Sequence, residues 1–389
     1  MAATDSRHSS SRLGYLDALR ATLVLLVIAH HSVEPYVSQA SFWTVFHAGL
    51  MPRGAVFLWV NATFFMGLMF FLAGYFTESS FARKGGRKFL ADRFVRLGIP
   101  LLIGVVAIIP FQGWFSYNAY SGSPWIGYWD YFTIDFLGRG PRPALWWRER
   151  WPEFQFGHLW FVEHLLVYAV LYAAWRLVAP SRPADPERSA PPRDAAIVAY
   201  AIGLTLVTVV IRQWYPQDTW IGLFRFIQME PAHIAQYASL FAIGCYAGPK
   251  GWIATMPTRR GLAWLAVGCA LAALAYVLVG AGLVWPIGTS QWMVCAWESA
   301  ICASLCVGLP VGFRELRLGA GRIWRMLDRN SYAAYVFHFP LVMAIQWALL
   351  GTGWPAVLRM VLTVPAAWVA TLALTNFVIL RLPGARRVF

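Results

Sequence analysis

A cation and an imidazole share one apolar stretch near the start of the chain. Residues 16–33 are hydrophobic enough for a membrane helix, yet they include Arg20 and, eleven positions later, His31. At 100° and 1.5 Å per residue, these side chains lie within about 20° of one helical face and about 16 Å apart along its axis. Polar groups at such depth are costly and usually mark a site or a pathway. The alternative is structural, with Arg20 extending to the interface, paired with Asp17, and His31 packed in the core.

Two more guanidinium groups stand at the beginning of a later apolar stretch. In FLADRFVRLGIPLL, Arg93 and Arg96 are three residues apart and share one face of an α-helix. Guanidinium forks suit phosphate oxygens, although such residues also serve as plain topological anchors at a cytoplasmic helix end. A ligand with phosphates at one end and a long arm would connect these arginines and Arg20 with His31. Coenzyme A has this shape, and its thioester would reach a neutral imidazole that can act as a general base near neutral pH.

Other polar residues within apolar stretches are weaker candidates. Glu163 could orient or charge-balance an imidazole, as an acid does in a catalytic triad. Because Glu163 and His164 face different sides of a helix, we expect only one of them to point inward. The candidates for substrate contact, each with a structural role as the alternative, are Trp160, His164 and His338. Glu298 stands in the middle of an apolar run and needs a partner that the sequence does not identify.

The composition places the chain in a lipid bilayer. Of its 389 residues, 59% are hydrophobic and 13% are charged, whereas a soluble domain usually carries about 25% charged residues. The net charge of +14 does not require nucleic acid, because the basic residues fall in short gaps between apolar runs, where membrane topology places them. The five cysteines form no pattern typical of a metal site or a disulfide framework. The sequence has no phosphate-binding glycine loop, GxSxG or HExxH motif, which disfavours an ATP-driven pump, a serine hydrolase and a zinc protease.

Apolar runs long enough to cross a membrane predict the fold class, an all-α polytopic bundle. A hydrocarbon core about 30 Å thick needs roughly 20 apolar residues per helix. Ten runs approach this length, and they are 16–36, 55–77, 97–116, 157–179, 195–214, 232–248, 261–284, 290–312, 331–350 and 356–380. The sixth run is the shortest of them.

The distribution of lysine and arginine predicts the orientation. Most of the 32 basic residues lie near the chain ends and in alternate gaps between the runs, which the positive-inside rule assigns to the cytoplasm. We therefore predict a cytoplasmic tail at 1–14, a transmembrane domain at 15–380 and a second cytoplasmic tail at 381–389. The long outer gap, 117–156, is rich in tryptophan and tyrosine, which suits an interfacial belt and also the face of a sugar ring.

Five stretches resemble the membrane acyltransferase-3 family. They are LDALRATLVLLVIAHH, FFLAGYF, FLADRFVRLGIPLL, HLWFVEHLLVY and SYAAYVFHFPL, and they follow the family's order over nearly the whole chain. The stretch GHLWFVEHLLVY is also similar to the branch that includes glucan succinyltransferases. The resemblance implies transfer of an acyl group from cytoplasmic acyl-CoA to a hydroxyl, often on a glycan, at or across a bacterial inner membrane.

The resemblance also implies roles for individual residues. Carried over by motif, His31 is the catalytic histidine, and the residues that hold the acyl donor are Arg20, Arg93 and Arg96. Acyl-CoA would be a co-substrate, with no permanently bound cofactor and no metal. The expected partners are membrane lipid, acyl-CoA and a glycan or glycolipid acceptor, and not nucleic acid. A transporter or flippase for an anionic or lipid-linked solute is the main alternative, because basic residues at a cytoplasmic mouth and a buried histidine would serve it too.

Overall fold

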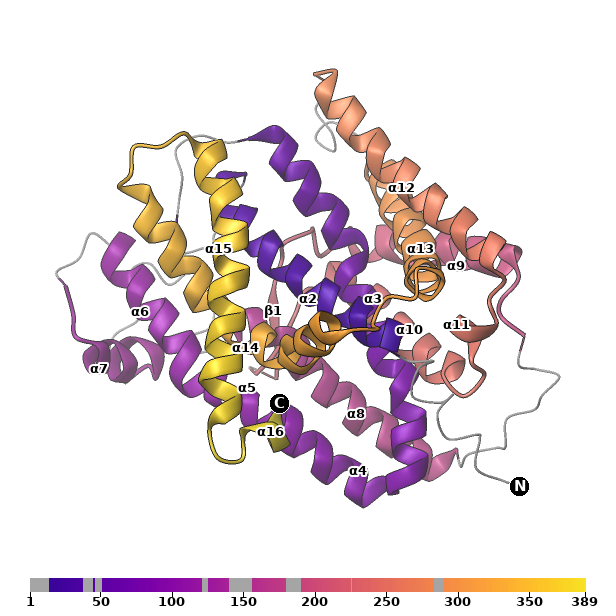
Figure 1. Cartoon of the computed structure of the whole chain (residues 1–389), viewed down its shortest axis with the longest axis horizontal. Coiled ribbons are helices and arrows are strands. Elements are labelled where there is room, and N and C mark those ends of the chain that lie inside the picture. Colours follow the sequence, from indigo (N-terminus) through magenta and orange to yellow (C-terminus); the bar gives the residue numbers. More distant parts are fainter. Residues whose placement is uncertain are drawn as a thin grey trace.

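The computed structural model is a bundle of long helices (Figure 1). It describes residues 14–37, 45, 51–120, 125–139, 156–179, 190–224, 226–282 and 290–389. Within these residues the only strands form one short antiparallel hairpin, made of β1 (Ile221–Leu223) and β2 (Ile227–Met229). The all-α polytopic class that the sequence predicts is therefore confirmed, while the cytoplasmic location of both termini stays a prediction.

The ten predicted spans coincide, in order, with helices. Nine of them are single helices: α2 (Gly14–Val33), α3 (Pro52–Lys84), α8 (Trp160–Val178), α9 (Asp194–Ile211), α10 (Pro231–Ala247), α12 (Thr258–Gly280), α13 (Gln291–Glu315), α14 (Arg322–Leu350) and α15 (Ala356–Phe377). The remaining span joins α4 (Gly86–Arg93), α5 (Ile99–Ile103) and α6 (Ile109–Tyr120) through π-helical turns at Phe94–Gly98 and Gly104–Ile108. Short helices are α7 (Tyr128–Asp130), α11 (Trp252–Thr255) and α16 (Ala385–Val388).

One predicted span is shorter than a typical membrane crossing. Of the helices in the described ranges, nine are long and apolar enough to cross a membrane. The sixth predicted span, α10, has 17 residues, as the short apolar run at that place suggests. Much of the outer aromatic segment predicted at 117–156 lies outside the described residues, including 140–155.

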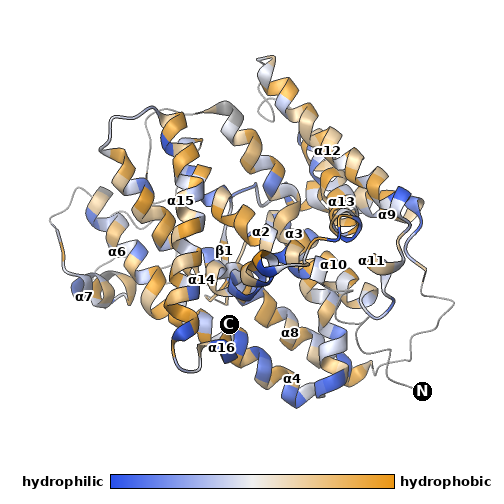
Figure 2. Ribbon diagram, viewed as in Figure 1, coloured by the Kyte–Doolittle hydropathy of each residue, from blue (hydrophilic) through white to orange (hydrophobic). Residues whose placement is uncertain are grey.

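The helices divide into a central and a peripheral group. In the most apolar stretch of each central helix, most residues are buried: 72% in α3, 67% in α13 and 61% in α2. In the peripheral helices the buried share of this stretch is 28% in α9, 17% in α15 and 11% in α12. The peripheral helices nevertheless carry mostly apolar residues, which Figure 2 shows in orange along α12 and α15. A helix that exposes apolar side chains on this scale is stable in lipid and not in water. The helix α2 therefore belongs to the central group, and its candidate Arg20 lies near one end with a partly exposed side chain.

Glycines allow α3 and α10 to approach very closely. A Cβ atom added at Gly74 would lie 2.2 Å from the backbone oxygen of Phe241, and one added at Gly244 would lie 2.2 Å from the backbone oxygen of Phe71. Small residues at such crossings permit the close packing that drives helix association in membranes. This contact anchors α10 to the central helix α3.

The α3–α10 crossing gives a stability prediction with a matched control. We expect Gly244→Ala to lower the free energy of unfolding by about 1–3 kcal/mol, because the new methyl group overpacks a backbone contact. Gly203→Ala in α9, where no atom lies within 4 Å of the added Cβ, should leave the unfolding temperature unchanged or higher. Thermal unfolding of the two variants in detergent tests this, and equal unfolding temperatures would contradict the proposed close approach.

Candidate active site

The helices α2 and α14 run parallel and meet in a fixed register. At one end, Arg20 of α2 donates to the carboxylate of Asp328 in α14 and also to that of Asp17, the latter at 3.2 Å. At the other end, the rings of His31 in α2 and His338 in α14 stack with their centroids 5.3 Å apart. The pairing of Arg20 with Asp17 confirms the expectation from their spacing. The Asp328 and His338 partners stand more than 300 residues away in the sequence.

Three imidazoles gather at the end of α2 that lies away from Arg20. His158, in the short turn Gly157–Leu159 before α8, packs edge-on against His338 with ring centroids 5.1 Å apart. Phe339 stacks on His158 at 5.0 Å and meets the edge of His31 at 5.4 Å. The cluster therefore combines side chains of three separate segments. The sequence singles out His31 and His338 but gives no signal that His158 joins them.

Backbone hydrogen bonds determine which ring nitrogens of this cluster can accept a proton. Nδ1 of His338 lies 2.7 Å from the carbonyl oxygen of Tyr335, and Nε2 of His158 lies 3.0 Å from that of Val336. Because a carbonyl only accepts, these nitrogens carry the ring hydrogens of the neutral forms. The opposite nitrogens, Nε2 of His338 and Nδ1 of His158, are buried and have no hydrogen-bond partner in the described part of the chain. Each thus offers a lone pair to a hydroxyl.

A second contact fixes the end of α2 that carries His31. The side-chain amide of Gln346 in α14 donates to the backbone oxygens of His31, at 2.9 Å, and Ser32, at 3.2 Å. The last carbonyls of a helix have no intrahelical partner, so this amide satisfies two of them. On a different side of α2, His30 stacks on Phe65 with ring centroids 5.1 Å apart. The two neighbouring histidines therefore have different surroundings.

The three candidate phosphate-binding arginines approach one turn of α14. Asp328 pairs with Arg20, and one turn later the Tyr332 hydroxyl donates to the backbone oxygen of Arg96 at 2.6 Å. The guanidinium of Arg93 lies over the ring of Phe89, 5.0 Å from its centroid. These contacts bring the cations of two distant sequence segments to the same region of the bundle.

The expected common face of Arg93 and Arg96 needs a correction. Arg93 is half-buried, whereas Arg96 is exposed. The reason is local, because the π-helical turn Phe94–Gly98 begins directly after Arg93 and changes the angular spacing between the two residues. The pair therefore presents one cation over an aromatic ring and one toward the surface.

Glu163 and His164 both point inward, so the expectation that only one would do so is wrong. Their side chains are 3% and 2% exposed, respectively. The Gln228 backbone N–H of β2 donates to the Glu163 carboxylate at 3.2 Å, and Nε2 of His164 donates to the Gln228 carbonyl at 2.9 Å. Trp160 stacks on Tyr237 and meets the edge of His164. These residues hold the β-hairpin on α8, and a catalytic role for Glu163 stays a prediction.

Glu298 has the partner that the sequence could not identify. Its carboxylate lies 2.7 Å from the guanidinium of Arg212, at the end of α9, and both side chains are largely buried. A second pair lies beside it, between Glu230 and His233, again at 2.7 Å. Burial raises the pKa of Asp218 in the preceding loop, and the carboxylate of Glu230 adds to this effect. Burial alone would raise the pKa of Glu230 too, but His233, the Asp218 amide and Arg212 together lower it.

Comparison with known proteins adds a family and distant relatives. The acyltransferase-domain model of the acyltransferase-3 family matches residues 13–379. Glucans biosynthesis protein C of Escherichia coli K12 is 24% identical over 351 residues, which cover 85% of this chain and 82% of that protein. The proteins of the same name from Escherichia coli O139:H28 and O81 are also 24% identical over the same shares. No solved structure matches the chain significantly.

The buried Arg212–Glu298 pair predicts strong coupling between its members. Glu298→Leu should cost about 3–5 kcal/mol of stability, because it leaves a buried guanidinium without its carboxylate. The double variant Arg212→Met/Glu298→Leu should regain most of this loss, since no buried charge is then left unpaired. Thermal unfolding in detergent measures both. As a control, Lys84→Met breaks the more exposed pair with Asp92 and should cost less than about 1 kcal/mol. Strictly additive effects of the two buried substitutions would contradict the coupling.

Proposed function

Because this chain belongs to the acyltransferase-3 family, we propose that it moves an acyl group from cytoplasmic acyl-CoA to a hydroxyl of an envelope glycan or glycolipid. The observation that carries the proposal is the register of α2 and α14, with cations at one end and imidazoles at the other. The name of the Escherichia coli relatives refers to glucan biosynthesis, which supports a glycan as acceptor. We place the protein in a bacterial inner membrane with both termini in the cytoplasm, in agreement with the distribution of basic residues.

The acyl donor binds along α2 and α14 in this proposal. Its phosphates bind the guanidinium groups of Arg20, Arg93 and Arg96. The guanidinium of Arg20 then contacts both a phosphate and the partly exposed carboxylate of Asp328. The pantetheine arm covers the distance of about 16 Å that separates Arg20 from His31 along the helix axis. The thioester then lies at the imidazole cluster, away from the aqueous surface at which the phosphates bind.

The proposed reaction is a direct transfer with His31 as general base. His31 accepts the proton of the acceptor hydroxyl while the hydroxyl oxygen forms a bond to the thioester carbonyl carbon. The tetrahedral intermediate collapses with cleavage of the carbon–sulfur bond, and the imidazolium returns the proton to the coenzyme A thiolate. The products are an ester and free coenzyme A. No metal or bound cofactor takes part.

The neighbouring imidazoles orient the acceptor. The buried lone pair on Nε2 of His338 accepts a hydrogen bond from a sugar hydroxyl, and Nδ1 of His158 provides a second acceptor nearby. Trp160 and His164 contribute through the β-hairpin that they hold, at the same end of the bundle as His158. Aromatic faces beside hydrogen-bonding groups suit a sugar ring, which binds through both.

The catalytic role of His31 is tested by a comparison with its neighbour. His31→Gln should lower the rate of acyl transfer by about 10²–10⁴-fold, the range that general-base catalysis supplies. His30→Gln changes the adjacent imidazole, which stacks on Phe65, and should retain activity within a few-fold. Purified variants receive radiolabelled acyl-CoA and a cell-envelope extract, and label on glycan is counted. Both should unfold at the wild-type temperature. Equal labelling by wild type and His31→Gln would remove His31 from the mechanism.

The arginines are tested through the donor Michaelis constant. Arg93→Ala and Arg96→Ala each remove a charge-assisted contact worth about 1.5–3 kcal/mol, so KM for acyl-CoA should rise roughly ten- to hundredfold with little change in kcat. Arg87→Ala removes an exposed arginine from the same segment and should leave KM unchanged. Steady-state kinetics with varied acyl-CoA distinguishes the variants. An unchanged KM in both Arg93→Ala and Arg96→Ala would overturn the donor site.

A further inference from the structure

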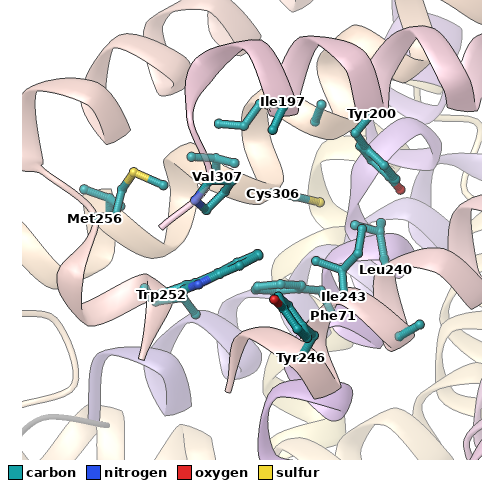
Figure 3. A pocket seen from close by; sticks show the side chains of 16 residues that line it. Phe71, Ile197, Tyr200, Leu240, Ile243, Tyr246, Trp252, Met256, Cys306 and Val307 are labelled. Atoms are coloured by element: carbon teal, nitrogen blue, oxygen red, sulfur yellow. The ribbon is translucent and has the colours of Figure 1, made fainter. Parts of the chain in front are cut away.

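A large apolar cavity lies apart from the proposed active site. Its volume is about 470 Å³, within the range of ligand-binding pockets. The residues that line it come from α3, α9, α10, α11 and α13, from the segment before α9 and from the end of α11, and none of them belongs to α2 or α14 (Figure 3). The donor path proposed above therefore does not use this space.

The lining of the cavity excludes ligands that are polar throughout. No charged side chain is part of it, and most lining residues are aliphatic or aromatic. The hydroxyl of Tyr200 is already engaged with Ser239 at 3.0 Å. A phosphate, a nucleotide or a sugar placed here would lose its hydration without replacement contacts, which is costly. A hydrocarbon chain gives up no hydrogen bonds on entering and gains dispersion contacts with the walls.

Cations stand at one edge of this cavity. The ammonium of Lys250 lies 2.9 Å from the hydroxyl of Tyr246, a lining residue, and 4.1 Å from the centroid of its ring. Arg314 donates to the backbone oxygens of two other lining residues, Ile253 at 2.6 Å and Met256 at 2.8 Å. Tyr246 is 56% exposed, so this edge reaches the surface of the protein. Arg314 also pairs with Glu315 at 2.8 Å. The edge therefore carries charged side chains, Lys250 among them, while the interior is apolar.

Trp252 adds a hydrogen-bond donor at the same place. Its indole lies across the cavity, between Val307 and Tyr246 (Figure 3). The indole Nε1 is buried and has no hydrogen-bond partner among the residues that the structure describes. An unsatisfied buried donor costs about 1–3 kcal/mol, so a ligand that supplies an oxygen to it gains affinity. Indole rings with one apolar and one polar side are typical of the membrane interface.

We propose that this cavity binds one acyl chain of an anionic phospholipid. The chain fills the apolar space between α9, α10 and α13, a glycerol ester oxygen accepts from Nε1 of Trp252, and the phosphate lies beside Lys250. The cavity lies against α9, a peripheral helix, which puts it close to the bilayer. The lipid completes the packing of α9 against the central helices and does not depend on the proposed reaction. Its negative headgroup is selected by the charged edge.

A photocrosslinking experiment tests the site on the full-length protein. The probe is phosphatidylglycerol with a diazirine in one acyl chain, added at low mole fraction to protein in nanodiscs of phosphatidylcholine. After illumination, peptides are mapped by mass spectrometry. We expect crosslinks concentrated on α9, α10 and α13, and at least fivefold less labelling there in Val307→Trp, which fills the cavity. Unlabelled phosphatidylglycerol should compete about tenfold better than phosphatidylcholine with the same chains.

Two conservative variants test recognition of the headgroup and binding in the cavity separately. They also replace Val307→Trp as the test if that variant fails to fold. Lys250→Gln should abolish the preference for phosphatidylglycerol over phosphatidylcholine, and Trp252→Phe, which keeps the ring and removes the N–H, should lower labelling several-fold. Lys88→Gln removes an exposed lysine of α4 and should change nothing. Labelling of α12 and α15 that is as strong as labelling of the cavity helices would indicate ordinary contact with bilayer lipid and would overturn the proposed site. Competition by long-chain acyl-CoA and not by phosphatidylglycerol would overturn the assignment to a phospholipid.

Discussion

The parallel contact between α2 and α14 is the constraint on which the site depends. Polar side chains inside a membrane are expensive unless a neighbouring helix supplies a partner, and α14 supplies one at each end of α2. Asp328 meets Arg20, and His338 meets His31, at nearly the same offset along the chain. A shift of one helical turn, about 5.4 Å, would separate both pairs at once. The side-chain amide of Gln346 donates to the backbone oxygen of His31 near the end of α2, and this hydrogen bond would also be lost after such a shift.

The sequence predicts the helices and part of the geometry within them, because both follow from local patterns. Apolar runs of membrane length become helices since a backbone in lipid must satisfy its own hydrogen bonds. The common face of Arg20 and His31 follows from 100° per residue alone. Partners on other helices carry no such local signal. The Arg212–Glu298 pair joins α9 to α13, and nothing in the spacing of either residue indicates the other.

Two local expectations failed for physical reasons that periodicity does not contain. Adjacent residues of a helix point about 100° apart, which suggests that Glu163 and His164 cannot share one environment. They do, because a strand lies across them and presents the N–H and C=O of one residue, Gln228, to both. The face shared by Arg93 and Arg96 changes because a π-helical turn begins between them. In the first case the deviation comes from a strand that is distant in the sequence, and in the second from a π-helical turn, and hydrophobic periodicity represents neither.

His158 connects the imidazole cluster to the β-hairpin. It stands two residues after Phe156, whose backbone N–H donates to the side chain of Gln228 at 2.9 Å. The same Gln228 is held by α8 through its backbone, so hydrogen bonds connect the hairpin, the turn and the helix. Because His158 also contacts His338, the same set of contacts extends from the hairpin to the imidazole cluster. In the proposed reaction, an acceptor at the hairpin would lie beside the turn that carries His158, whose buried Nδ1 can accept a hydrogen bond from it.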